Sequence, residues 1–203
     1  INRLTLGDYK YYSGGWNDNN YYEEKSLTYD KNGNIGTLIR SDQYGSNTVN
    51  YTYNYTGNQL SNINSGTSYV YDQNGNTTTD GLRGMTIAYN VLNLPSNITK
   101  SSESISYIYS AAGEKLAKRM KDNTYQYYAG NMVYKNDKSL NYILMEEGLV
   151  NKSSSVYVYE YHLKDHLGNT RVTFQPNGGS TTTTQVAEYY PFGSTYAPLS
   201  PAG

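Results

Sequence analysis

The pattern best suited to chemistry is His162-Leu163-Lys164-Asp165-His166, which gathers both histidines of the chain around one carboxylate. A histidine pair four residues apart binds metal when it lies on a helix. Here the surroundings indicate a strand and then a turn, so the two histidines lie about 13 Å apart along an extended chain unless the turn folds them together. We therefore expect no metal site, and interpret Asp165 as the residue that starts a turn before Gly168.

Other catalytic patterns are missing from the sequence. The chain has no Cys, which excludes thiol nucleophiles, disulfides and thiolate metal sites. It contains no G-x-S-x-G elbow. Glu146 and Glu147 are adjacent, so on a strand their carboxylates point to opposite faces. We expect no enzyme activity, no catalytic residue and no cofactor.

The composition indicates an amphipathic sheet. Hydrophobic residues make up 36% of the 203 residues, and 26 Tyr stand against two Phe and one Trp. Each Tyr buries a large ring but keeps a hydroxyl that needs a partner. The net charge of −1 gives no basic patch for nucleic acid. No apolar run approaches the ~20 residues of a membrane helix. Because residue 1 is Ile rather than Met, the sequence could be a fragment or a processed chain.

A short phrase that ends in glycine repeats along the chain. Most successive copies are 17 to 20 residues apart, and one step of 24 fits a loop insertion. The clear copies are Tyr29-Asp30-Lys31-Asn32-Gly33, Tyr53-Asn54-Tyr55-Thr56-Gly57, Tyr71-Asp72-Gln73-Asn74-Gly75 and Tyr109-Ser110-Ala111-Ala112-Gly113, with a degenerate Tyr89-Asn90-Val91-Leu92-Asn93 and looser copies at Gly130, Gly148 and Gly168. Internal periods of this length indicate a repeat architecture.

The repeated phrase has the chemistry of a hairpin turn. Asp at its first turn position accepts hydrogen bonds from the backbone ahead, and Gly at the fourth supplies positive φ for a type I turn with a G1 bulge. Between turns, stretches such as "VYVYEYH" (156–162) alternate with period two, which predicts strands. One period therefore holds two strands and two short turns. Isolated hairpins are marginal in water, so we expect neighbouring repeats to pair edge to edge.

Two stretches contain helix-forming residues and are ambiguous. They are "SAAGEKLAKRMKDN" (110–123) and "LNYILMEEGLV" (140–150). Gly113 falls in the first turn of the former, at the repeat position, so we favour turn and strand there over a short helix. We favour strand for the latter. The predicted fold class is all-β: consecutive antiparallel hairpins that form one continuous, curved or spiralling sheet, part of a β-shell.

The sequence also resembles a known family. The Tyr-Asp repeats, "YHLKDHLGNTRVTF" (161–174) and "EYYPFGSTY" (188–196) are similar to bacterial RHS/YD-repeat proteins, and more narrowly to the RHS repeat-associated core region. The weaker Tyr-Asp-x-x-Gly signal extends the resemblance over residues 1–196, and residues 197–203 form a C-terminal tail, which could be truncated. The residues assigned to structural repeat turns are Tyr29, Asp30, Gly33, Tyr53, Gly57, Tyr71, Asp72, Gly75, Tyr109, Gly113, Asp165, Gly168, Asn169, Arg171, Tyr190, Pro191 and Gly193.

The resemblance implies a structural function. Members of the family form a hollow shell of spiralling sheet, which in toxin proteins encloses a C-terminal toxic domain. Their core region continues to an Asp-Pro-x-Gly self-cleavage motif, and this sequence contains no Asp-Pro dipeptide. We therefore expect a non-enzymatic segment of a secreted or cell-surface bacterial shell. Its partners would be the rest of its own polypeptide or further copies, by strand-edge pairing, and an enclosed toxin domain.

An alternative interpretation makes the chain a binding module. It would be an extracellular adhesin or a self-associating filament subunit, using exposed strand edges and Tyr-rich faces. Rows of Tyr with Asn and Thr between them could stack on glycans. Cross-strand Tyr pairs that hold the sheet together are the simpler explanation of the same rows.

Overall fold

Strands and turns make up the described part of the chain. The computed structural model describes residues 3–45 and 48–195, which contain no helix. No helix suitable for crossing a membrane therefore occurs in those residues. The strands are β1 (Lys10–Tyr12), β2 (Trp16–Asp18), β3 (Glu24–Tyr29), β4 (Ile35–Ser41), β5 (Thr48–Thr56), β6 (Gln59–Ile63), β7 (Val70–Tyr71), β8 (Thr77–Asp80), β9 (Met85–Tyr89), β10 (Pro95–Lys100), β11 (Glu103–Tyr109), β12 (Lys115–Arg119), β13 (Tyr125–Ala129), β14 (Met132–Tyr134), β15 (Leu140–Met145), β16 (Gly148–Ser153), β17 (Val156–Lys164), β18 (Thr170–Asn177) and β19 (Ser180–Val186).

The prediction of an all-β fold of consecutive hairpins is confirmed. Every named strand pair is antiparallel and joins neighbours along the chain, as in β10 with β11 and β17 with β18. Both ambiguous stretches form strands, because residues 110–123 contain β12 and residues 140–150 contain β15 and the start of β16. The predicted tail, residues 197–203, lies outside the described residues.

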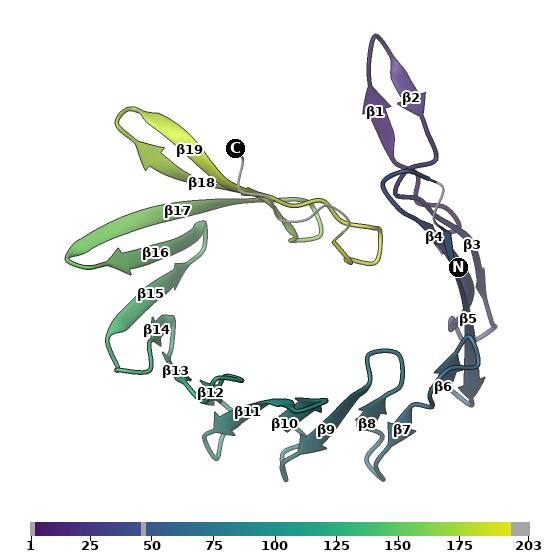
Figure 1. Ribbon diagram of the computed structural model, residues 1–203, viewed down its shortest axis with the longest axis horizontal. Helices are drawn as coiled ribbons and strands as arrows, with labels where there is room; N and C mark the ends of the chain where they lie inside the picture. Colours follow the sequence, from purple (N-terminus) through teal and green to yellow (C-terminus); the bar gives the residue numbers. More distant parts are fainter. Residues whose placement is uncertain (1–2, 46–47, 196–203) are drawn as a thin grey trace.

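The strip is divided into three sheets, which corrects the expectation of one continuous sheet. β1–β2 form a separate hairpin, β3–β6 form a four-stranded sheet, and β7–β19 form a thirteen-stranded sheet. At the seam after β6, Asn64 and Ser65 have φ of 52° and 55°, in the left-handed region. A backbone hydrogen bond from Tyr69 N to Ser61 O, of 2.8 Å, crosses the seam. Figure 1 shows the strip curving from β3 to β19 into a wide arc.

Turns alternate between the two long edges of the strip. We call the repeat edge the one that carries the turn between β3 and β4. Because the chain meanders, every second turn returns to this edge. The turns there comprise residues 30–34, 57–58, 72–76, 90–94, 110–114, 130–131, 146–147 and 165–169. The period near eighteen residues is therefore the length of chain between successive visits to one edge.

The tyrosine before a repeat-edge turn ties neighbouring hairpins together. Its hydroxyl donates a hydrogen bond to the backbone carbonyl that follows the previous turn on the same edge. In four such tyrosines the distance is 2.9 to 3.0 Å. The pairs are Tyr55 with Ile35, Tyr71 with Leu60, Tyr89 with Thr77, and Tyr109 with Pro95. We name these contacts the tyrosine latches. They explain why the repeat uses Tyr rather than Phe, since the ring packs across the hairpin while the hydroxyl satisfies a carbonyl.

Removing one latch hydroxyl should lower stability measurably. We expect Tyr109→Phe to lower the free energy of unfolding by about 1 kcal/mol, because it leaves the carbonyl of Pro95 without this donor. Tyr157→Phe is the matched control, since Tyr157 is 51% exposed on β17. Urea unfolding followed by circular dichroism measures both variants. Equal effects would contradict the latch.

Few hydrophobic side chains are buried, and most of them are not aromatic. Among the described residues the buried set is Leu27, Leu38, Ile63, Ala117, Val133, Val150, Ala187 and Tyr190. Aromatic contacts add to this thin core, as where Tyr125 stacks on Tyr127 at 5.9 Å and Tyr161 on Phe174 at 5.4 Å. The strip is thus stabilised mainly by strand pairing, cross-strand side-chain contacts and the tyrosine latches, rather than by a large apolar core.

Candidate functional site: the turn that closes the strip

The Asp-type turns on the repeat edge share one geometry. In the first, Asp30 N donates to Asn34 O at 3.0 Å, and Gly33 N donates to Asp30 O at 3.2 Å. The Asp30 carboxylate accepts from both the backbone and the side-chain amide of Asn34, each at 2.8 Å. Gly33 has φ of +98°, which favours glycine. Asp72 with Gly75, and Asp165 with Gly168 and Asn169, repeat this arrangement.

These turn carboxylates should make stability depend on acidity. Hydrogen bonds from the following asparagine lower the pKa of Asp30, Asp72 and Asp165 below the ordinary value of 3.8. A carboxyl group whose pKa is lower in the folded than in the unfolded state stabilises the fold at a pH above its unfolded-state pKa. This stabilisation is lost as the pH falls through the folded-state pKa. We expect the urea concentration at the unfolding midpoint to decrease as the pH is lowered from about 5 to about 2. For the variant Asp30→Asn/Asp72→Asn/Asp165→Asn, the urea midpoint should decrease less steeply with falling pH. An unchanged pH dependence would contradict the stabilising role of these turn carboxylates.

Two of the predicted copies differ in detail. Ser110 takes the place of Asp in the turn before β12, where Gly113 has φ of +87° and donates to Ser110 O. Gly57 belongs instead to a two-residue turn with Asn58, since Thr56 pairs with Gln59. Tyr53 therefore lies inside β5 opposite Ile63, and Tyr55 makes the latch. The alignment of that copy is wrong by two residues, because a shorter turn brings the latch tyrosine closer to its glycine.

Neighbouring turns on the repeat edge are joined by asparagine side chains. Asn58 Oδ1 accepts from Asn32 Nδ2 at 2.9 Å and from Asn34 Nδ2 at 3.2 Å. Asn93 Oδ1 accepts in the same way from Asn74 and Asn76, both at 2.9 Å. These contacts fix the spacing between one turn and the next along the edge.

The segment "YYPFG" forms a further turn of the same type. Gly193 N donates to Tyr190 O, and Tyr190 N donates to Ser194 O, both at 2.8 Å. Tyr189 is its latch, donating to Thr170 O at 2.9 Å. Tyr190 thus occupies the position that Asp holds in the other copies. Its side chain has a different task, because it does not fold back on its own turn.

Tyr190 joins the end of the strip to its beginning. Its hydroxyl donates to Ser41 O in β4 at 2.6 Å, across 149 residues of sequence. Its ring lies edge-on to that of Tyr22, with centroids 6.4 Å apart. Only 8% of Tyr190 is exposed, and this burial raises its pKa. In Figure 1 the segment after β19 reaches across the mouth of the arc towards β4. We call Tyr190, Ser41, Arg40, Glu24 and Tyr22 the closure site.

An ion pair between partly exposed Arg40 and buried Glu24 lies next to Tyr190. The Arg40 guanidinium carbon lies 4.6 Å from the centroid of the Tyr190 ring, within range of a cation–π contact. Arg40 also donates from Nε to Glu24 Oε1 at 2.9 Å, and from Nη2 to the same oxygen. Glu24 is fully buried, and its other oxygen has no hydrogen-bond partner. Arg40 is therefore the main hydrogen-bonding partner of the Glu24 carboxylate.

The bare backbone of Gly7 lets the closing turn approach. Gly7 pairs with Glu24 in an isolated bridge at the edge of β3. A Cβ on Gly7 would lie 2.1 Å from Pro191 Cγ, closer than real atoms approach. Pro191 and Gly7 therefore contact each other only because residue 7 has no side chain.

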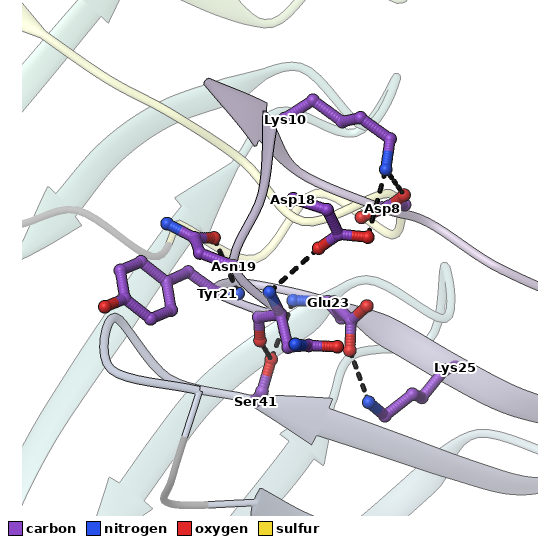
Figure 2. Close-up of polar contacts among 9 residues, drawn as sticks. Asp8, Lys10, Asp18, Asn19, Tyr21, Glu23, Lys25 and Ser41 are labelled. Atoms are coloured by element: carbon purple, nitrogen blue, oxygen red, sulfur yellow. Dashed lines mark hydrogen bonds and ion pairs between the residues drawn. The ribbon is translucent and has the colours of Figure 1, made fainter. Parts of the chain in front are cut away.

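A polar cluster lies at the start of β3 and the end of β4, and Figure 2 shows its contacts. Ser41 Oγ donates to Asn20 O and accepts from Glu23 N, both at 2.8 Å. Nearby, Asp8, Asp18 and Glu23 bring carboxylate oxygens within 4.8 Å of one another, as a metal site would. Lys10 Nζ occupies this space, at 2.6 Å from Asp8 and 3.0 Å from Asp18. Lys25 pairs with Glu23. We interpret the cluster as a lysine-neutralised network.

The two histidines lie in different surroundings. His162 Nε2 is 3.2 Å from Glu160 Oε1 on β17, whereas His166 lies in the turn after that strand. His166 lines a pocket of about 260 Å³ beside the closing turn, together with Asn169, Arg171 and Tyr189. Arg171 Nη2 is 3.8 Å from Glu188 Oε1, and its guanidinium lies 5.9 Å from the Tyr189 ring. The two family-like phrases, "DHLGNTR" and "YYPFG", thus meet in space.

Comparison with known proteins agrees with this architecture. No protein-family model matches the chain. Over 135 residues, 65% of its length, the chain is 33% identical to the tRNA3(Ser)-specific nuclease WapA of Bacillus spizizenii, of which it spans 5%. The Photorhabdus luminescens Tc holotoxin pore superposes on 86% of the chain with a TM-score of 0.63 and 15% identity. TcdB2-TccC3-TEV superposes on 89% with a TM-score of 0.64 and 16% identity.

These similarities show a β-rich fold that the chain shares with part of much larger proteins. The chain spans 10% of each solved Tc chain, so it corresponds to a small part of a much larger molecule. The solved structures share its fold, and the WapA similarity extends to the sequence.

Proposed function

We propose that the chain is a non-enzymatic structural segment of a secreted or cell-surface RHS/YD-repeat shell, of the kind that encloses a C-terminal toxin in longer relatives. One observation supports the proposal above all: the strip curves until its last turn contacts β4, through Tyr190 and Ser41. A strip closed in this way would form one ring in the wall of a larger shell. The shared fold with Tc chains supports this reading.

The chemistry of the site favours a wall over an enzyme. In the described residues, neither histidine hydrogen-bonds a Ser or Thr hydroxyl, and the side chains of the closure site contact each other. The Asp residues of the repeat turns are engaged with their own backbone. Their role is to shape the edge of the strip.

The proposal is tested on the protein as its own organism makes it. Intact mass spectrometry of the purified native polypeptide should give a mass well above the 22.8 kDa of this chain. Cryo-electron microscopy of that polypeptide should show a hollow wall with density inside. Limited proteolysis should cut the enclosed part only after the wall is denatured. A native mass of 22.8 kDa together with ordered polymers would contradict the shell and support the filament.

A second candidate function, an adhesin or filament subunit, has its own support. β19 is paired only with β18, so its other edge is uncovered in the described residues. On β17, Tyr157, Tyr159 and Tyr161 are 51%, 48% and 39% exposed on one face. Glycan-array binding that is lost in Tyr157→Ala/Tyr159→Ala would favour adhesion over the shell.

A further inference from the structure

Three Asn-Gly dipeptides occur in the chain, and the structure treats them differently. They are Asn32-Gly33, Asn74-Gly75 and Asn177-Gly178. Asn-Gly is the dipeptide most prone to lose the side-chain amide, because glycine offers no side chain to block its own backbone nitrogen. All three asparagines are exposed to solvent, so accessibility does not distinguish them.

The first two are restrained by the repeat-edge turns. The attacking nitrogen would be Gly33 N or Gly75 N, and each donates to the carbonyl of its turn Asp, at 3.2 and 3.1 Å. The Asn32 side-chain amide is also fixed, since it donates to Asn58 at 2.9 Å, and Asn74 donates to Asn93 at 2.9 Å. Both the nucleophile and the electrophile are therefore held in place.

Asn177-Gly178 lacks the restraint on the nucleophile. It forms the tip of the β18–β19 hairpin, where Asn177 pairs with Ser180 around Gly178 and Gly179. The hydrogen bonds of the described residues include none donated by Gly178 N. Nothing lies within 4 Å of the position a Cβ would take at either glycine. The Asn177 amide has one side-chain contact, to Thr182 Oγ1 at 3.1 Å.

We propose that Asn177 is a site of spontaneous deamidation, and that the repeat-edge turns protect Asn32 and Asn74 from the same reaction. Gly178 N attacks Asn177 Cγ and loses its proton, and the side-chain nitrogen leaves as ammonia. The resulting succinimide takes up one water, which opens the ring at either carbonyl. The products are an aspartyl or an isoaspartyl residue. One water enters, one ammonia leaves, and no oxidation occurs.

The reaction would change the uncovered end of the strip. Each event adds one negative charge next to β19, in a chain whose formal net charge is −1. An isoaspartyl product also lengthens the backbone of the two-residue turn. Charge at an exposed strand edge opposes edge-to-edge pairing. Ageing at Asn177 would thus reduce the tendency of this edge to bind further strands.

The test compares the three sites within one molecule. The folded chain and a urea-unfolded sample are incubated at mildly alkaline pH, and peptide mapping by mass spectrometry follows each site. Dividing the deamidation rate in the folded chain by the rate in the unfolded chain, site by site, removes the effect of the local sequence. We expect this ratio to be about tenfold lower at Asn32 and Asn74 than at Asn177, since their hydrogen bonds must break first. Equal ratios at the three sites would overturn the proposal.

Two variants sharpen the comparison. Asn58→Ala removes the acceptor of Asn32 and leaves the Asn74 turn intact, so the rate at Asn32 should rise while that at Asn74 stays constant. Asn177→Gln should remove the main acidic species on charge-resolved chromatography. If Asn58→Ala raises neither rate, the protective role of the turn contacts is wrong. If the acidic species persists in Asn177→Gln, the site is wrong.

Discussion

Tyr190→Ala is expected to lower the free energy of unfolding by about 3–5 kcal/mol, the range for truncating a large buried aromatic side chain. Tyr190 is 8% exposed and its ring contacts both Arg40 and Tyr22, so its loss leaves a cavity next to the Arg40–Glu24 ion pair. It also removes the hydroxyl that donates to Ser41 O. The end of the strip then loses this hydrogen bond to β4. Guanidinium unfolding followed by circular dichroism measures the change.

Two further variants separate the ring from the hydroxyl and the closure from general damage. Tyr190→Phe keeps the ring and should cost about 1–3 kcal/mol, because a buried carbonyl loses its donor. Phe192→Ala is the matched control in the same turn, since Phe192 is 48% exposed. Small-angle scattering should show a larger radius of gyration only for Tyr190→Ala. A Tyr190→Ala protein as stable and compact as Phe192→Ala would show that the turn does not hold the strip closed.

The local parts of the fold could be predicted from sequence because their causes are local. Asp30 and Gly33 specify their turn through hydrogen bonds within five residues, and alternation along residues 156–162 specifies a strand. The same reasoning failed by two residues at Tyr53, because Gly57 lies in a turn of another length. Turn length is decided by which residues pair, and the phrase alone does not contain that information.

The closure site could be predicted only in part. Tyr190 was assigned to a turn, but its contact with Ser41 spans 149 residues, which no local pattern reveals. One signal was present: two tyrosines precede Pro191, where the latch needs only one, so the second was available for another contact. Glu23 and Glu24 gave no signal, since adjacent acidic residues normally indicate an exposed surface. Their burial follows from the covering segments, which only the folded chain brings together.

Arg40→Met should be comparably destabilising, by about 3–5 kcal/mol, because it leaves the Glu24 carboxylate buried and unpaired. Glu24 is fully buried, and its second oxygen already lacks a partner, so Arg40 is its main compensation. Arg40→Lys should recover only part of the loss, because an ammonium cannot reproduce the planar contact with the Tyr190 ring.

A double-mutant cycle identifies the cause of this effect. Replacing both partners, as Arg40→Met/Glu24→Leu, should restore most of the stability lost in Arg40→Met, since two apolar side chains of similar volume need no charge compensation. Glu24→Gln alone should cost less than Arg40→Met, because a neutral amide is cheaper to bury than a carboxylate. Urea unfolding of the unchanged protein, Arg40→Met, Glu24→Leu and Arg40→Met/Glu24→Leu gives the coupling energy. Purely additive effects would mean that Arg40 stabilises the closure through Tyr190 and Tyr51 alone, and that the charge of Glu24 is compensated by another group.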